Sequence, residues 1–83
     1  MSEPEAIVHH VDARRLLCPL PVIRTQNAVK PLPDGAIVLV TATDPGVTHD
    51  IPAWCRVHGH DVLAVDRVDD EIQVRLMVHK KQA

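Results

Sequence analysis

Strict alternation near the C-terminus is the feature that most restricts the fold of this chain. Residues 72–78 place an apolar side chain at every second position, with polar or unbranched residues between them: Ile72, Val74, Leu76 and Val78. A period of two is typical of a β-strand that buries one face and exposes the other. A sheet of such strands leaves one face open, so any helices must lie together on the opposite face.

Three further segments are rich in aliphatic and β-branched residues and predict strands over about 7–12, 36–43 and 61–66. The 36–43 segment shows no alternation. Its pattern is typical of a central strand that is either shielded on both faces or flanked by other strands.

Two segments bounded by Pro and Gly predict helices. The first covers about 19–30. The second begins between Thr48 and Asp50, which are competent N-caps, carries Pro52 in its first turn and ends at Gly59. The resulting order is βαβαββ, so we expect a two-layer α/β sandwich whose four-stranded mixed sheet carries both helices on one face.

Composition excludes several classes of protein. The 83 residues predict one domain over 1–83, with its core at about 7–79, and the net charge of −2 lacks the basic excess of a nucleic-acid binder. Trp54 is the one aromatic residue, too few for a base-stacking surface, and two cysteines are too few for a disulfide framework. No signal-peptide or membrane-length apolar segment is present. We expect a cytoplasmic domain that binds neither nucleic acid nor membrane.

Cys18 is the main candidate for chemistry. It lies at or beside the N-cap of the first predicted helix, where Pro19 and Pro21 restrict how the sulfur is presented. Unpaired N–H groups and the helix dipole favour a thiolate there, so we expect a pKa below about 8.5. Arg14 and Arg15 are candidates for electrostatic support of that thiolate. The alternative is that Cys18 is a small buried apolar residue, the commoner role of a free cysteine.

The surroundings of Cys18 limit its chemistry. A Cys-His hydrolase requires a pocket that holds a histidine base, a residue that orients the base and an oxyanion hole. A domain of this size has little room for such a pocket. A thioredoxin-like site requires a second cysteine nearby, where the chain has Leu20 and Pro21. The residues favour a thiol that accepts a group from one protein and passes it to another. A thiol redox sensor that pairs Cys18 with Cys55 remains a weaker alternative.

The first predicted helix also offers a docking surface. At 100° per residue, its core face is formed by Val22, Thr25, Ala28, Val29 and Leu32. Leu20 and Ile23 fall on the opposite face with Arg24 and Asn27. Two apolar side chains beside a charge, near the thiol, can seat a partner protein, although isolated exposed apolar residues are common.

The second predicted helix holds the remaining candidates. Cys55, His58 and His60 form a Cys-x-x-His-x-His cluster, but structural zinc sites draw ligands from two clusters and the second is missing. We therefore expect no metal. Cys55 is expected in the core beside Trp54, the main packing anchor of this helix, and Asp44 in a turn.

Two ordered motifs resemble those of a known family. The first is Leu17-Cys18-Pro19-Leu20-Pro21-Val22, preceded by Asp12-Ala13. The second combines Ala42-Thr43-Asp44-Pro45-Gly46, Asp50-Ile51-Pro52-Ala53-Trp54 and Gly59-His60-Asp61-Val62. Together they resemble the TusA family of sulfur carriers, also called SirA-like, over about 11–78.

The resemblance implies a βαβαββ sandwich and a persulfide on Cys18, with no other cofactor. It implies a cysteine desulfurase or rhodanese-like donor, and a DsrE-type or thiolation-pathway acceptor for tRNA thiolation, molybdenum-cofactor maturation or sulfur oxidation. Such a protein is a sulfurtransferase-type carrier rather than a turnover enzyme, and serial docking favours a monomer. A non-catalytic interaction or regulatory module with an inert Cys18 is the alternative.

Two positions depart from the family pattern. Arg15 stands where the family often has Gly, so a positive φ there would be costly. Asn27 stands near a position where the family often has a basic residue, and Arg24, one turn earlier, is a candidate substitute.

Overall fold

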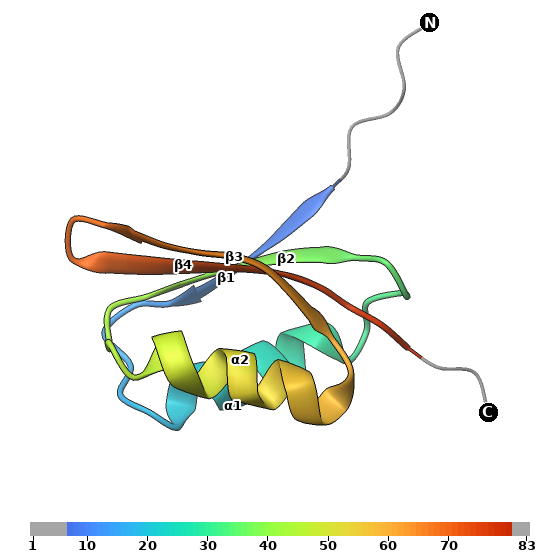
Figure 1. Cartoon of the computed structure of the whole chain (residues 1–83), viewed down its shortest axis with the longest axis horizontal. Helices are drawn as coiled ribbons and strands as arrows, with labels where there is room; N and C mark the ends of the chain where they lie inside the picture. Colours follow the sequence, from blue (N-terminus) through green and yellow to red (C-terminus); the bar gives the residue numbers. More distant parts are fainter. Residues whose placement is uncertain (1–6, 81–83) are drawn as a thin grey trace, which may run out of the picture.

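Four strands and two helices form the computed structural model, which describes residues 7–80. The elements are β1 (Val8–Ala13), α1 (Leu20–Val29), β2 (Ile37–Ala42), α2 (Val47–His58), β3 (Asp61–Val68) and β4 (Glu71–Met77). This order and the two-layer α/β architecture confirm the predicted fold. Both helices lie on one face of the sheet (Figure 1).

The strands lie in the order β1-β2-β4-β3. β1 and β2 are parallel, whereas β4 runs antiparallel to both β2 and β3. The parallel pair needs a crossover connection, which α1 supplies. Ala13 pairs with Ala42 at the carboxyl ends of β1 and β2. The loops that follow these two strands therefore leave the same end of the sheet.

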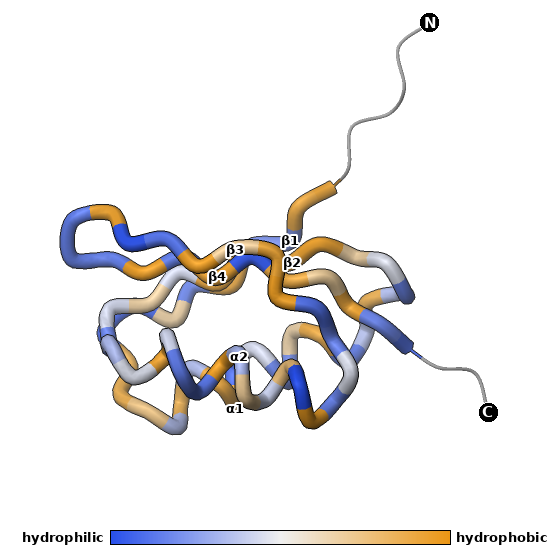
Figure 2. The backbone as a smooth tube through the Cα atoms, viewed as in Figure 1, coloured by the Kyte–Doolittle hydropathy of each residue, from blue (hydrophilic) through white to orange (hydrophobic). Residues whose placement is uncertain are grey.

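Alternating burial fixes which face of each strand meets the helices. Along β4 the apolar positions are buried and the intervening side chains are only partly covered. β2 also alternates in burial, because one of its faces meets the helices while Ile37 and Leu39 face the open side of the sheet. Its two edges are paired with β1 and β4. Of the two alternatives predicted for this segment, a central strand flanked by other strands is therefore confirmed. The β3–β4 hairpin carries both hydrophobic and hydrophilic segments (Figure 2), but β3, unlike β4, shows no alternation in burial.

Helix α1 packs the predicted face against the sheet. Thr25 and Val29 are buried, whereas Leu20 and Ile23 are 50% and 47% exposed. Pro19 is the N-cap residue and Pro21 the second helical position, where neither missing N–H costs a helical hydrogen bond. Cys18 thus directly precedes the cap.

Helix α2 begins earlier than predicted, at Val47. The Asp44 carboxylate accepts the Gly46 N–H at 2.9 Å, and the Asp44 carbonyl accepts the Val47 N–H at 3.1 Å. This turn starts the helix before either expected cap residue, so Pro52 lies inside the helix rather than in its first turn. The predicted end is confirmed, since Gly59 adopts a left-handed conformation with φ of 81°.

The core is aliphatic and lies between sheet and helices. From α2 it receives Val47, Ile51 and Cys55, all fully buried, while Trp54 packs only partly against it. The prediction of Trp54 as the main anchor of α2 was therefore wrong. No helix within the described residues is long and apolar enough to cross a membrane.

Candidate functional site

Cys18 lies in the loop between β1 and α1, packed at the edge of the core but partly exposed. The Cys18–Pro19 peptide bond is cis. Cys55 is fully buried, as predicted, and both cysteines are free thiols. The accessible thiol of the chain is therefore that of Cys18.

Two hydrogen bonds fasten the Cys18 loop to the loop that follows β2. The Arg15 N–H donates to Thr43 Oγ1 at 2.8 Å, and the Cys18 N–H donates to Asp44 Oδ2 at 2.8 Å. These bonds form because parallel pairing of β1 and β2 brings both loops to one end of the sheet. The two sequence motifs, which have residues 23–41 between them, thus meet at one site.

The electrostatics of the Cys18 thiol are opposite to the prediction. Burial, together with hydrogen bonding and charge repulsion from the Asp50 and Asp44 carboxylates, raises the pKa of Cys18 to about 12. The expected effect of the α1 N-terminus is outweighed because the Cys18 backbone N–H is bound to a carboxylate and two carboxylates surround the sulfur. Cys18 is therefore a neutral thiol at pH 7 in the free protein.

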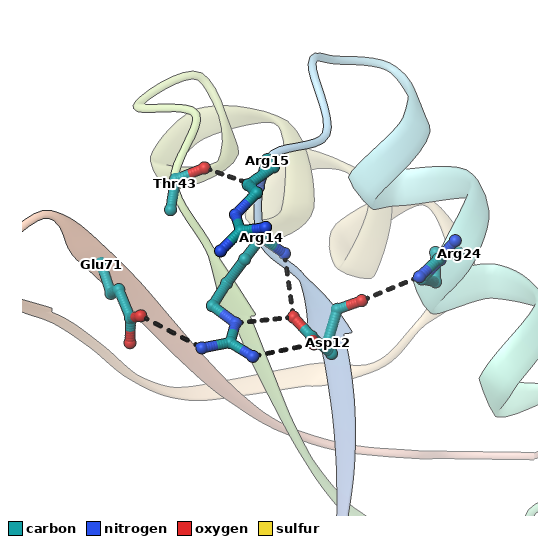
Figure 3. Close-up of polar contacts among 6 residues, drawn as sticks. All are labelled: Asp12, Arg14, Arg15, Arg24, Thr43 and Glu71. Carbon is teal, nitrogen blue, oxygen red and sulfur yellow. Dashed lines mark hydrogen bonds and ion pairs between the residues drawn. The ribbon is translucent and has the colours of Figure 1, made fainter.

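Neither Arg14 nor Arg15 is among the causes of the Cys18 pKa shift, so neither supplies the predicted support for a thiolate. Figure 3 shows Arg14 bound instead to Asp12 and Glu71. The Arg14 guanidinium binds both oxygens of the Asp12 carboxylate at 2.9 and 3.0 Å and lies 3.6 Å from Glu71 Oε2. These contacts hold the pKa of Asp12 down at about 2. The main causes of the Cys18 pKa shift are burial and aspartates, and no arginine is among them. The positive charge of Arg14 is neutralised by its ion pairs with the carboxylates of Asp12 and Glu71.

Arg15 retains the backbone conformation for which glycine is better suited. Its φ is 67°, in the left-handed region. The loop therefore keeps its path without a glycine, at the cost of backbone strain.

The predicted docking residues do lie together. Leu20, Ile23 and Arg24 line a partly open groove of about 200 Å³, joined by Leu16 and Asn27. The Arg24 guanidinium also donates to the Asp12 carbonyl at 3.0 Å (Figure 3), which ties α1 to the end of β1. Two of the residues that line the groove, Leu16 and Leu20, are each two positions from Cys18 along the chain.

Three residues at the site were not assigned to it from the sequence: Asp44, Gly46 and Asp50. A Cβ on Gly46 would lie 3.3 Å from Cys18 Sγ and from Asp44 Oδ1, and 3.7 Å from Asp50 Oδ2. Thr48 and Asp50, expected as caps, do not cap α2; the Thr48 hydroxyl donates to the Pro45 carbonyl. The signal that could have placed Asp44 and Asp50 was their presence in the second motif.

The histidines near the end of α2 contribute to packing. The rings of His58 and His60 lie 5.3 and 5.0 Å from that of Trp54. His60 Nδ1 accepts the His79 N–H at 3.0 Å. Among residues 7–80, no group of three or more His, Cys, Asp or Glu side chains can hold a metal ion.

Comparisons with known proteins agree with this geometry. Residues 9–80 match the family model described as sulfurtransferase TusA. YrkI of Bacillus subtilis (strain 168), named as a candidate sulfur carrier protein, is 45% identical over 53 residues, 64% of this chain and 71% of YrkI. A crystal structure of a SirA-like protein from Desulfitobacterium hafniense shares the fold, with a TM-score of 0.75 and 21% identity over 89% of this chain and all of that one. The chain belongs to the TusA family of sulfur carriers.

Proposed function

We propose that this protein carries sulfane sulfur as a persulfide on Cys18. A donor protein, a cysteine desulfurase or a rhodanese-like enzyme, loads the thiol, and an acceptor of the DsrE type or of a thiolation pathway removes the sulfur. The sulfur then serves tRNA thiolation, molybdenum-cofactor maturation or sulfur oxidation. The carrier itself requires no cofactor, and it requires a reducing compartment such as the cytoplasm, where its thiols stay free.

The observation that carries this proposal is the contrast between the two cysteines. Cys18 is partly exposed in the loop before α1, two residues along the chain from the groove residues Leu16 and Leu20, whereas Cys55 is fully buried. Exchange between thiols and persulfides requires direct access to the sulfur. The groove at Leu20 and Ile23 supports docking of each partner in turn, with the pocket chemistry left to the partner.

Intact-mass measurement after incubation with a charged donor tests the proposal. Rhodanese with thiosulfate, or a cysteine desulfurase with cysteine, should add the mass of one sulfur atom, reversible by a reductant. The gain should vanish in Cys18→Ser and persist in Cys55→Ser. Equal loading of both variants, or none of the unaltered protein, would refute Cys18 as the carrier.

The raised pKa of Cys18 favours a second candidate function. A thiol with a pKa of about 12 is a weak nucleophile at neutral pH, as an interaction or regulatory module with an inert cysteine would have. In that case the groove binds a regulated protein, and Cys18→Ser leaves binding unchanged. The two functions separate in the same mass experiment, because the module acquires no sulfur from any donor.

A further inference from the structure

Two carboxylates from a different part of the chain surround the Cys18 thiol. Asp44 belongs to the loop after β2 and Asp50 to the first turn of α2. Sγ of Cys18 and one oxygen of each carboxylate lie within 3.3–3.7 Å of the point that a Cβ on Gly46 would occupy. The absence of a side chain at Gly46 is what allows these three groups to approach each other.

The two carboxylates have different partners. Asp44 accepts the backbone N–H groups of Cys18 and Gly46 at 2.8 and 2.9 Å, and these bonds lower its pKa. It therefore stays ionised and positions the loop. The Asp50 carboxylate interacts with the Cys18 thiol, and among residues 7–80 no backbone N–H and no other side chain donates a hydrogen bond to it.

We propose that Asp50 determines which sulfur donors can load Cys18: because its carboxylate lies beside the thiol, loading requires a donor protein that presents positive charge to Asp50 when it docks. This inference rests on the proposed carrier function. It also gives the donor a chemical description, namely a cationic rim around its own persulfide sulfur.

The charged groups around the site explain why the countercharge must come from outside. From the loop after β2 and from α2, the thiol faces Asp44 and Asp50. On its own side of the site, the guanidinium groups of Arg14 and Arg24 are bound to the carboxylate and the carbonyl of Asp12. The Arg15 side chain is exposed, and it is not among the groups that shift the pKa of Cys18. An approaching cation would neutralise the two aspartates and favour the thiolate. The same aspartates would repel an anionic persulfide and so favour its transfer onward.

The loading step is balanced without an added oxidant or reductant. In the docked complex the Cys18 thiol loses its proton and attacks the outer sulfur of the donor's persulfide. A bond forms between Cys18 Sγ and that sulfur, while the donor's sulfur–sulfur bond breaks. The electron pair leaves on the donor's inner sulfur, which takes up the proton that Cys18 lost. One thiol and one persulfide are present before and after the step.

The rate of alkylation of Cys18 by iodoacetamide, measured against pH in Asp50→Asn, tests the inference directly. Loss of the carboxylate should lower the apparent pKa by at least about one unit, so the rate at pH 8 rises about tenfold. Asp66→Asn, which removes an exposed carboxylate on β3, is the control with the same change in net charge and should leave the profile unchanged. A merely loosened loop would raise the rate at every pH without moving the midpoint, and that result would overturn the proposal.

A second measurement compares two sulfur sources. Glutathione persulfide has no protein surface, so it should load the unaltered protein much more slowly than charged rhodanese does. Asp50→Asn should lower the ratio of the rhodanese loading rate to the glutathione persulfide loading rate at least several-fold. An unchanged ratio or an unchanged alkylation midpoint would overturn the role of Asp50. Failure of the unaltered protein to load from either source would refute the carrier function instead, while the alkylation profile would still decide whether Asp50 controls the thiol.

Discussion

Replacement of Arg15 by glycine should stabilise the protein, because Arg15 holds a φ of 67°. A left-handed conformation costs an L-residue about 1–2 kcal/mol, and glycine avoids that cost. Glycine also makes the unfolded chain more flexible, which offsets about 0.4–1 kcal/mol. The two ranges differ by about 0–1.6 kcal/mol and their midpoints by about 0.8 kcal/mol, so we expect Arg15→Gly to raise the free energy of unfolding by about 0.5–1 kcal/mol.

The contacts of Arg15 support this estimate. Its backbone N–H donates to Thr43 Oγ1, and glycine keeps that N–H. Within residues 7–80, the Arg15 side chain makes no hydrogen bond or ion pair, and the residue is exposed. The substitution therefore removes strain without removing a partner.

Thermal unfolding followed by circular dichroism measures the effect. For a domain of this size, 0.5–1 kcal/mol corresponds to a rise in Tm of roughly 2–8 °C. Gly35→Ala is the matched control of opposite sign: Gly35 has a φ of 87° with no atom near its Cβ position, so Tm should fall by roughly as much. If Gly35→Ala lowers Tm while Arg15→Gly leaves Tm unchanged or lowers it, the left-handed backbone conformation of Arg15 does not destabilise the protein, and the reasoning is refuted.

Three further predictions concern pH and docking. Burial and neighbouring cations lower the pKa of His60, so its contribution to stability is complete above the ordinary histidine pKa of about 6.5 and is lost as the pH falls below that value. His60→Asn should reduce the dependence of Tm on pH between about pH 7 and 5, and an unchanged dependence would contradict this. Backbone hydrogen bonds from Cys18 and Gly46 lower the pKa of Asp44, so its contribution to stability is present above about pH 4 and is lost below it. Asp44→Asn should therefore weaken the dependence of Tm on pH below about pH 4, and an unchanged slope would contradict this. Ile23→Glu should slow loading of Cys18 by rhodanese several-fold while changing stability by less than about 0.5 kcal/mol, and equal loading rates would exclude the groove from docking.

The fold was predictable because local patterns agree with the tertiary structure. Alternation over 72–78 marks the buried face of β4, and the proline pair marks the start of α1. The start of α2 was not predictable in the same way. Thr48 and Asp50 are good cap residues, but Asp44 satisfies the turn with its own carboxylate and starts the helix sooner.

The electrostatics of Cys18 were not predictable because they depend on strand pairing. The sequence near Cys18 contains two arginines and a helix start, which together favour a thiolate. Parallel pairing of β1 with β2 brings Asp44 and Asp50 to the sulfur from more than 25 residues away along the chain. The residues next to Cys18 in the sequence do not indicate how close these carboxylates lie to the sulfur. The prediction failed because it counted only charges near in sequence.

A neutral resting thiol resolves a conflict that any free carrier of sulfur faces. A permanently lowered pKa would make Cys18 reactive toward every persulfide, oxidant and electrophile that it meets. A raised pKa keeps the empty thiol unreactive between partners, but it also leaves the thiol unreactive toward its proper donor. In the proposed loading step, Asp44 and Asp50 keep the carrier unreactive alone and let it react in a complex. The proposed docking groove would then act together with these carboxylates, since it would bring the partner to the charges that restrain the thiol.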